Sequence, residues 1–119
     1  MESQQEQLRN RTKDFAIRIV RIFRTLPYKT EAQVLGKQLL RSGTAVAANY
    51  RASCRARSKA EWIAKIGIVV EEADESVFWL EMLSDCEIVQ LKKLELILKE
   101  AHELSALFTA SQRTSRGAR

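Results

Sequence analysis

Apolar residues recur every three or four positions along almost the whole chain, and the only proline is Pro27. This spacing places the apolar side chains on one face of a helix, and no stretch shows the alternation that is typical of a half-buried strand. Because 45% of the 119 residues are hydrophobic, the chain has enough apolar side chains for a core of its own. The sequence therefore predicts a single all-α domain and excludes collagen-like and intrinsically disordered chains.

Local signals indicate where the first two helices begin and end. The first is expected to begin at Thr12 or Asp14 and to end before Pro27, because a residue that precedes proline disfavours the helical conformation. Thr30 is a capping residue for the second helix, which should reach about Cys54.

The third and fourth helices have signals of the same kind. Ser58 and Glu61 form an S-x-x-E capping box for a long third helix. Ser84 and Glu87 repeat that spacing at its last turn. A fourth amphipathic segment then runs from Leu91 to about Phe108. Four helices with short connections pack most simply as an antiparallel up-down-up-down four-helix bundle. We assign residues 1–11 to an N-terminal extension, 12–110 to the bundle and 111–119 to a flexible basic tail.

The net charge of +5 hides a strong asymmetry along the chain. Residues 9–65 contain fourteen Lys or Arg and three acids, whereas residues 66–112 contain three Lys and ten acids. One half of the molecule is thus cationic and the other is anionic. This layout suits a polyanionic partner for the basic half, pairing between copies of the chain, or both.

Several of these cations share one face of the second helix, and others lie on the first helix and in the connection after the second. Such a surface typically neutralises phosphates, although a single basic residue is more often just part of a solvated helix face. Tyr28 and Tyr50 are the only aromatic candidates nearby, so recognition of the backbone is expected rather than base stacking. The predicted nucleic-acid-binding residues are Arg18, Arg21, Lys37, Arg41, Arg51, Arg55 and Arg57.

Two features predict a contact between subunits. Glycines within the second helix indicate close approach by another backbone. The third helix is apolar on more than one side and so needs a second cover. Trp79 could instead lie in the bundle core if the third helix is rotated. The carboxylates of Glu72 and Glu75 could pair with Arg41 or Arg51, within the chain or across subunits. The predicted oligomer-interface residues are Gly36, Gly43, Ile68, Glu72, Glu75 and Trp79.

The sequence offers little for catalysis or metal binding. A di-iron centre in a four-helix bundle needs a Glu-x-x-His sequence on each of two helices. The single histidine is His102, and the residue three positions before it is Lys99 rather than glutamate. Cys54 lies among arginines without a histidine partner, and Cys54 and Cys86 form no CxxC pair. We therefore expect no catalytic residue, metal or cofactor, and a non-enzymatic protein. The longest apolar run is far shorter than the roughly 20 residues of a membrane span, which favours a cytoplasmic protein with no membrane partner.

Three blocks carry a family resemblance: QLLRSGTAVAANYR at 38–51, RARS at 55–58, and EEADES at 71–76 followed by FWL at 78–80. They resemble the bacterial four-helix-bundle family named for proteins encoded in the intervening sequences of 23S rRNA genes. Ala52 stands where members often have glutamate. The resemblance implies an antiparallel bundle that forms a ring-like homopentamer. It favours Arg41, Asn49, Glu72, Glu75 and Trp79 as structural or interface positions.

A related branch comprises the accessory variability determinants of diversity-generating retroelements, which bind nucleic acid and a reverse transcriptase through a basic surface. From the charge pattern and this resemblance we expect a non-enzymatic oligomer that binds RNA or DNA non-specifically, as an accessory to an rRNA or retroelement ribonucleoprotein. The alternative is an interaction scaffold whose basic half docks on an acidic partner or on a neighbouring subunit.

Overall fold

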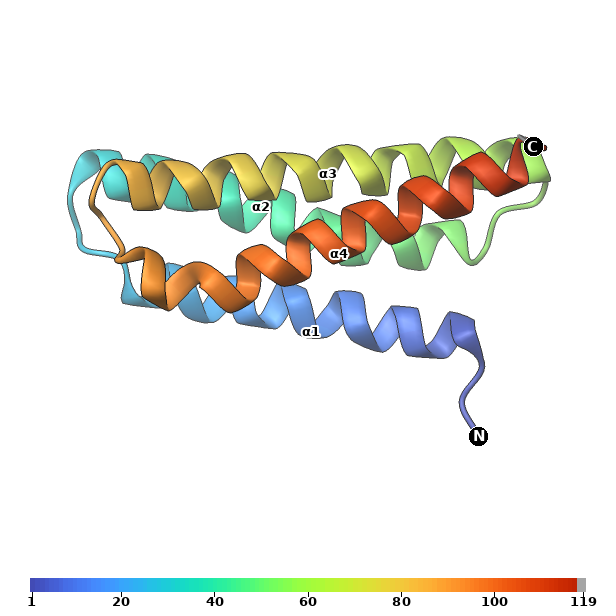
Figure 1. The fold of residues 1–119 in the computed structure, drawn as a ribbon, viewed down its shortest axis with the longest axis horizontal. Helices are drawn as coiled ribbons and strands as arrows, with labels where there is room; N and C mark the ends of the chain where they lie inside the picture. The colour runs from blue at the N-terminus through green and yellow to red at the C-terminus, as the bar shows by residue number, and fades with distance from the viewer. Residues whose placement is uncertain (118–119) are drawn as a thin grey trace.

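The computed structural model describes residues 1–117, and within this range it contains four α-helices and no strand. The prediction of an all-α protein with four helices is confirmed. The body is elongated, with extents of 45 × 29 × 22 Å (Figure 1). No helix in residues 1–117 combines the length and the apolar character that a bilayer crossing requires. The helices are α1 (Gln4–Thr25), α2 (Thr30–Ser53), α3 (Lys59–Asp85) and α4 (Leu91–Ser115).

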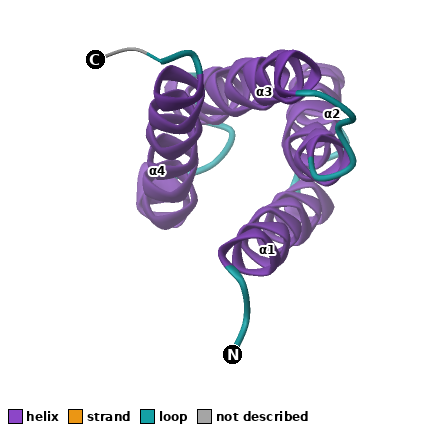
Figure 2. Ribbon diagram, turned by 90° about the vertical axis from the view of Figure 1, so that its right-hand side faces the viewer, coloured by secondary structure: helices purple, strands orange, loops and turns teal. Residues whose placement is uncertain are grey.

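The four helices form an open arc rather than a closed square. Helix α2 packs against both α1 and α3, and α3 packs against α4, whereas α1 and α4 touch at few points. The view along the bundle shows α1 and α4 at the two ends of this arc (Figure 2). The start of α1 and the end of α4 lie at the same end of the molecule (Figure 1).

Serine caps define the starts of α1 and α3. The Ser58 side chain accepts a hydrogen bond from the Glu61 backbone N–H at 3.0 Å, which confirms the predicted start of α3. Ser3 accepts the equivalent bond from Glu6 at 3.1 Å, so α1 begins at Gln4, well before the predicted Thr12 or Asp14. The residues assigned to an N-terminal extension are therefore mostly helical.

The end of α3 shows why one capping prediction is wrong. Ser84 and Glu87 do not start a helix. Instead, the Glu87 N–H donates to the Ser84 carbonyl at 3.0 Å and the Ile88 N–H donates to the Leu83 carbonyl at 2.9 Å. Glu87 has a φ of 59°, the left-handed conformation that usually requires glycine. This pair of bonds is a Schellman motif, and it turns the chain toward α4.

Helix α4 also extends beyond its predicted end. It continues to Ser115, and the Arg116 N–H donates to the Gln112 carbonyl at 3.0 Å. Most of the segment predicted as a flexible tail is therefore helical. Ala118 and Arg119, the last two residues of that predicted tail, lie outside the described residues.

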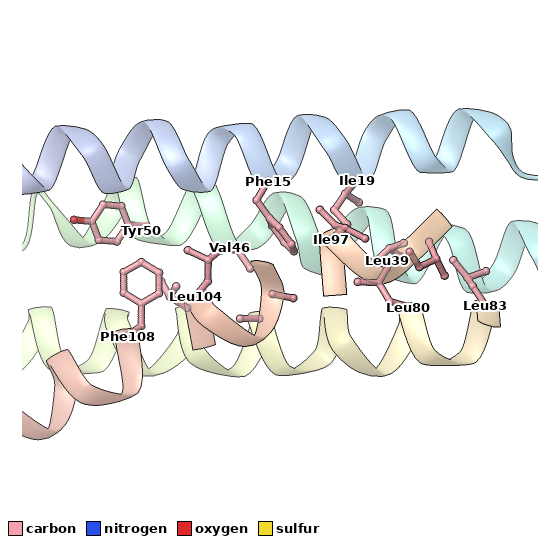
Figure 3. Close-up of a cluster of buried hydrophobic side chains, with 14 of the residues drawn as sticks. Phe15, Ile19, Leu39, Val46, Tyr50, Leu80, Leu83, Ile97, Leu104 and Phe108 are labelled. Atoms are coloured by element: carbon pink, nitrogen blue, oxygen red, sulfur yellow. The ribbon is translucent and has the colours of Figure 1, made fainter. Parts of the chain in front are cut away.

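All four helices contribute to one hydrophobic core (Figure 3). Phe15 and Ile19 of α1 are fully buried, and the ring centroids of Tyr50 and Phe108 are 5.1 Å apart. Ser42 and Ser76 are buried polar residues whose hydroxyl oxygens are 2.9 Å apart, which joins α2 to α3 by a hydrogen bond. No buried side-chain nitrogen or oxygen in residues 1–117 lacks a partner.

The glycines of α2 have a role inside the chain. A Cβ on Gly43 would lie 2.7 Å from Cγ1 of Ile19, and a Cβ on Gly36 would meet Leu26 and Phe23. These neighbours all belong to α1 or its end, and both glycines are buried. The close backbone approach that the sequence predicted is therefore between α2 and α1. This corrects the assignment of Gly36 and Gly43 to an oligomer interface.

Candidate nucleic-acid interface

A groove with two adjoining lobes lies between α1 and α2, and we call it the α1–α2 groove. The first lobe has a volume of about 390 Å³ and the second about 340 Å³. Arg9, Lys13 and Arg51 line both lobes. The first lobe is also lined by Glu6, Asn10, Cys54 and Arg55, and the second by Thr44, Ala47 and Ala48.

The cations of this groove have no carboxylate partner. Within residues 1–117, no acidic oxygen lies within 4.0 Å of the charged nitrogens of Arg9, Lys13, Arg51 or Arg55. Glu6 lines the first lobe, and its carboxylate accepts a long hydrogen bond of 3.5 Å from the Ser3 hydroxyl. Four cations therefore face Glu6 across a concave surface, and a second carboxylate, that of Glu2, accepts a hydrogen bond at 2.8 Å from Asn10 of the same lobe.

Tyr50 lies beneath this region without adding charge to it. Burial, together with the neighbouring Cys54, raises the pKa of Tyr50 to about 12. The phenol is therefore neutral at physiological pH, and its ring packs against Phe108 in the core. It is not free to stack on a base.

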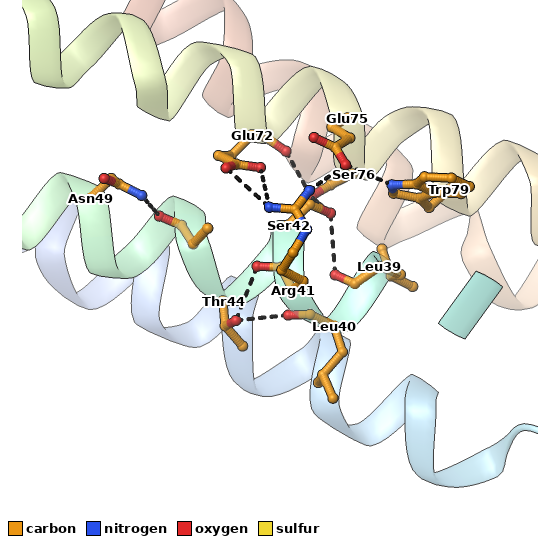
Figure 4. A network of polar contacts seen from close by, with 11 residues as sticks. Leu39, Leu40, Arg41, Ser42, Thr44, Asn49, Glu72, Glu75, Ser76 and Trp79 are labelled. Carbon is orange, nitrogen blue, oxygen red and sulfur yellow. Dashed lines mark hydrogen bonds and ion pairs between the residues drawn. The ribbon is translucent and has the colours of Figure 1, made fainter. Parts of the chain in front are cut away.

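Arg41 lies farther along α2 in a different environment (Figure 4). Its guanidinium donates to both carboxylate oxygens of Glu72 at 3.2 Å and also to Glu75. The indole N–H of Trp79 donates to Glu75 at 3.1 Å. The hydrogen bond from Arg41 lowers the pKa of Glu75 below its usual range, and the same bond raises the pKa of Arg41.

This cluster confirms that the acids of α3 pair with Arg41 within the chain. The carboxylates of Glu72 and Glu75 also neutralise the charge of Arg41 locally, so Arg41 attracts a polyanion less than the cations of the α1–α2 groove do. Nearby side chains on α2 bond to their own helix: Thr44 donates to the Leu40 carbonyl at 2.7 Å, and Asn49 donates to the Ala45 carbonyl at 2.9 Å (Figure 4). Asn49 thus has a local structural contact.

A second ion-pair cluster joins α1 to α4, and the sequence analysis missed it. Arg11 donates to Glu100 through two nitrogens at 2.8 Å and to Glu103 at 2.9 Å. This bidentate geometry is the strongest form of an Arg–carboxylate contact. It joins α1 to α4, which otherwise touch less than the other packed helix pairs do.

The remaining predicted binding residues do not line the groove. Arg18 is partly buried, whereas Arg21 and Lys37 are exposed. Arg21 lines a separate hollow between α1 and the start of α4, together with Val89 and Lys93. Arg57 is exposed and lies 3.9 Å from Glu61. The structure therefore joins Arg51 and Arg55 to Arg9 and Lys13, two residues outside the predicted binding set.

Comparisons with known proteins agree with the fold. The sequence profile of the 23S rRNA-intervening sequence protein family matches residues 4–110. The chain belongs to this family. A crystal structure from Bacteroides thetaiotaomicron, described as a protein of unknown function from the S23 ribosomal protein family, is 32% identical. That match covers 93% of this chain and 99% of the other, with a TM-score of 0.86. No curated protein shows significant similarity to the chain.

In this family member, the second face of α3 exposes apolar side chains. Ile68 is 36% exposed and Phe78 is 49% exposed. Phe78 packs edge-on against Trp79, with ring centroids 4.8 Å apart, and Trp79 is half-buried. Val34 of α2 is also exposed. Among the predicted interface residues, Ile68 and Trp79 therefore still have apolar surface for a partner, whereas Glu72 and Glu75 bind Arg41.

Proposed function

We propose that this member of the 23S rRNA-intervening sequence protein family is a non-enzymatic nucleic-acid-binding protein. It binds RNA or DNA through phosphate contacts, without sequence preference, as an accessory of an rRNA or retroelement ribonucleoprotein. The observation that carries this proposal is the group of unpaired cations on α1 and α2. Such cations are available to neutralise phosphates and release counterions.

Filter binding of structured RNA across a salt series tests this function. The logarithm of the binding constant should fall linearly as the logarithm of the salt concentration rises. Affinity that is undetectable at low salt, or that does not change with salt, would reject nucleic-acid binding. Mutated sequences of the same length should bind equally well, because phosphate contacts carry no sequence information.

We further propose that the subunit is an antiparallel up-down-up-down bundle that assembles into a ring-like homopentamer. Exposed Ile68 and Phe78 support a subunit contact on α3, because large apolar side chains on a second helix face favour burial by a partner. Light scattering at micromolar concentration tests the assembly. A mass near that of the 13.6 kDa chain would reject it.

An interaction scaffold is the alternative, and the opposite charges of the two halves favour it specifically. In that case the basic half docks on an acidic protein or on the acidic half of a neighbouring subunit. Replacing Arg51 and Arg55 with glutamate would then disrupt assembly. If nucleic acid is the partner, the same variant loses RNA affinity and keeps its subunit count.

A further inference from the structure

The two lobes of the α1–α2 groove differ in a way that matches the chemistry of a nucleic-acid backbone. The first lobe is lined almost entirely by polar side chains, with Arg9 and Lys13 from α1 and Arg51 and Arg55 from the end of α2 and the turn after it. The second lobe shares three of these cations but also has Ala47 and Ala48. Methyl side chains let a ligand approach the helix closely, and they offer an apolar surface next to the cations.

We propose that the α1–α2 groove binds the sugar-phosphate backbone of a nucleic acid. Phosphate oxygens bind Arg9, Lys13, Arg51 and Arg55, and a ribose packs on Ala47 and Ala48. This inference rests on the proposed function and deepens it by placing the contact at one groove. It also adds Arg9 and Lys13, which belong to a segment first interpreted as an extension.

The position of the cations supports phosphate binding. Arg9 and Lys13 are four residues apart on one face of α1, Arg51 is in the last turn of α2, and Arg55 is in the turn that follows α2. The groove runs between these pairs. Arginine guanidiniums bind phosphate oxygens through two parallel hydrogen bonds, and lysine adds a point charge. Four such groups on opposing walls can hold consecutive phosphates.

The lining also favours the backbone over the bases. Neither lobe is lined by a tryptophan, tyrosine or phenylalanine side chain in residues 1–117. Base-stacking proteins use such rings as platforms. A groove without them should treat different base sequences alike.

Three variants test the groove. Arg9→Ala with Lys13→Ala removes two cations from α1 while keeping the fold-determining apolar face. Lys92→Ala with Lys99→Ala removes the same charge from exposed positions on α4 and is the matched control. Ala48→Leu leaves the charge unchanged but fills part of the second lobe, and leucine is a good helix former. Thermal unfolding by circular dichroism checks that all three keep the fold.

Fluorescence anisotropy with labelled oligouridylate and labelled oligothymidylate measures the affinity over a salt series. The Arg9/Lys13 variant should bind both probes about tenfold or more weakly, and its salt slope should fall by about 0.7 for each lost phosphate contact. The Lys92/Lys99 control should keep most of the affinity. Ala48→Leu should weaken binding several-fold with an unchanged salt slope.

The outcomes distinguish a failure of the groove assignment from a failure of the proposed function. If the wild-type chain binds but the Arg9/Lys13 variant and the α4 control lose equal affinity, attraction is diffuse and the groove assignment is overturned. The groove assignment is also overturned if the Ala48→Leu variant binds with the affinity of the wild type. If the wild-type chain binds neither probe at low salt, the groove assignment fails, and the proposed function fails with it when structured RNA does not bind in the filter assay either.

Discussion

The α1–α2 hairpin and the α3–α4 hairpin have the same secondary structure and opposite charge. Residues 4–53 contain ten Lys or Arg and three acids, whereas residues 59–115 contain six Lys or Arg and eleven acids. Contact between the hairpins neutralises only some of these charges. Arg41 reaches Glu72 and Glu75 of α3, and Arg11 reaches Glu100 and Glu103 of α4.

The place of a cation in the folded chain decides whether that cation remains available to a partner. Arg41 and Arg51 are on the same helix, yet only Arg41 faces the acids of α3. Arg51 lines the α1–α2 groove with Arg9, and Glu6 is the one acid among residues 1–117 that lines either lobe. The number of arginines in the sequence therefore overstates the surface that can bind a polyanion.

The largest effect is expected from reversing charge in the basic hairpin. Arg51→Glu with Arg55→Glu should lower RNA affinity at least about a hundredfold, because two charge-assisted contacts are lost and repulsion is added. Arg41→Gln should change the affinity by about twofold or less, since its charge is already paired. Filter binding at fixed salt measures both. An equal loss in the two variants would show that pairing with α3 does not withdraw Arg41 from the binding surface.

A second difference between the hairpins is how closely their helices approach. Gly43→Ala in α2 would press a Cβ against the buried, branched Ile19, and overpacking of this kind costs about 1–3 kcal/mol. Gly67→Ala in α3 meets only the side-chain end of Gln112, which can move at the expense of its hydrogen bond to the Ile63 carbonyl. It should gain up to about 1 kcal/mol from helix propensity.

Urea unfolding of the two alanine variants measures this contrast. The free energy of unfolding should fall for Gly43→Ala by about 1 kcal/mol or more, because overpacking outweighs propensity. It should stay equal or rise for Gly67→Ala. Equal changes in both variants would mean that α1 can move away from α2 without penalty.

The hairpins also differ in their connections. The α3–α4 connection places Glu87 at positive φ, whereas the α1–α2 connection has no such residue. Glu87→Gly should raise the free energy of unfolding by about 0.5–1 kcal/mol, because glycine adopts this conformation without a Cβ clash. Glu87→Ala is the control, since it keeps the clash. A stabilisation by alanine equal to that by glycine would point to the lost carboxylate as the cause.

The smallest effect concerns the contact between hairpins at low pH. Arg41 lowers the pKa of Glu75 in the folded state, so this stabilisation is fully present above the ordinary pKa of glutamate. It is lost as the pH falls through the lowered value. The Glu75 side chain is 37% exposed, so the contribution should stay below about 1 kcal/mol.

Urea unfolding of the wild type and of Glu75→Gln at pH 7 and pH 3 measures this linkage. The difference in stability between the two proteins should shrink as the pH falls from 7 to 3, because Glu75 takes up a proton as the pH falls toward its lowered pKa and the glutamine side chain does not titrate. A difference that does not change with pH would assign the effect of the variant to the Trp79 contact and not to charge.

Much of the fold follows from the sequence, but its motifs are not equally informative. The S-x-x-E spacing predicts the start of α3 at Ser58. The same spacing at Ser3 and Glu6 marks the start of α1, in a segment too polar to show helical periodicity. At Ser84 the spacing misleads, because Ile88 and the Leu83 carbonyl close a Schellman motif there.

The site was harder to predict than the helices. Arg51 follows from the predicted basic face of α2, whereas Arg55 lines the groove from the turn after α2 ends at Ser53. That Arg9 and Lys13 line the same groove depends on the relative position of α1 and α2, and the glycines of α2 determine how closely the two helices pack. The hydrophobic periodicity of a single helix does not predict how that helix is placed relative to another helix. The pairing of Arg41 with α3 required the same information, although opposite charge on the two helices hinted at it.

The two thiols of the chain lie in different surroundings, and this has a practical use. Cys54 lines the groove beside Arg51 and Arg55, whereas Cys86 is exposed where α3 ends, at the opposite end from the start of α1 (Figure 1). A fluorophore on Cys86 can therefore report binding without obstructing it. An alkylating reagent directed at Cys54 competes with any ligand bound in the α1–α2 groove. The alkylation rate of that thiol therefore measures the fraction of grooves that are occupied.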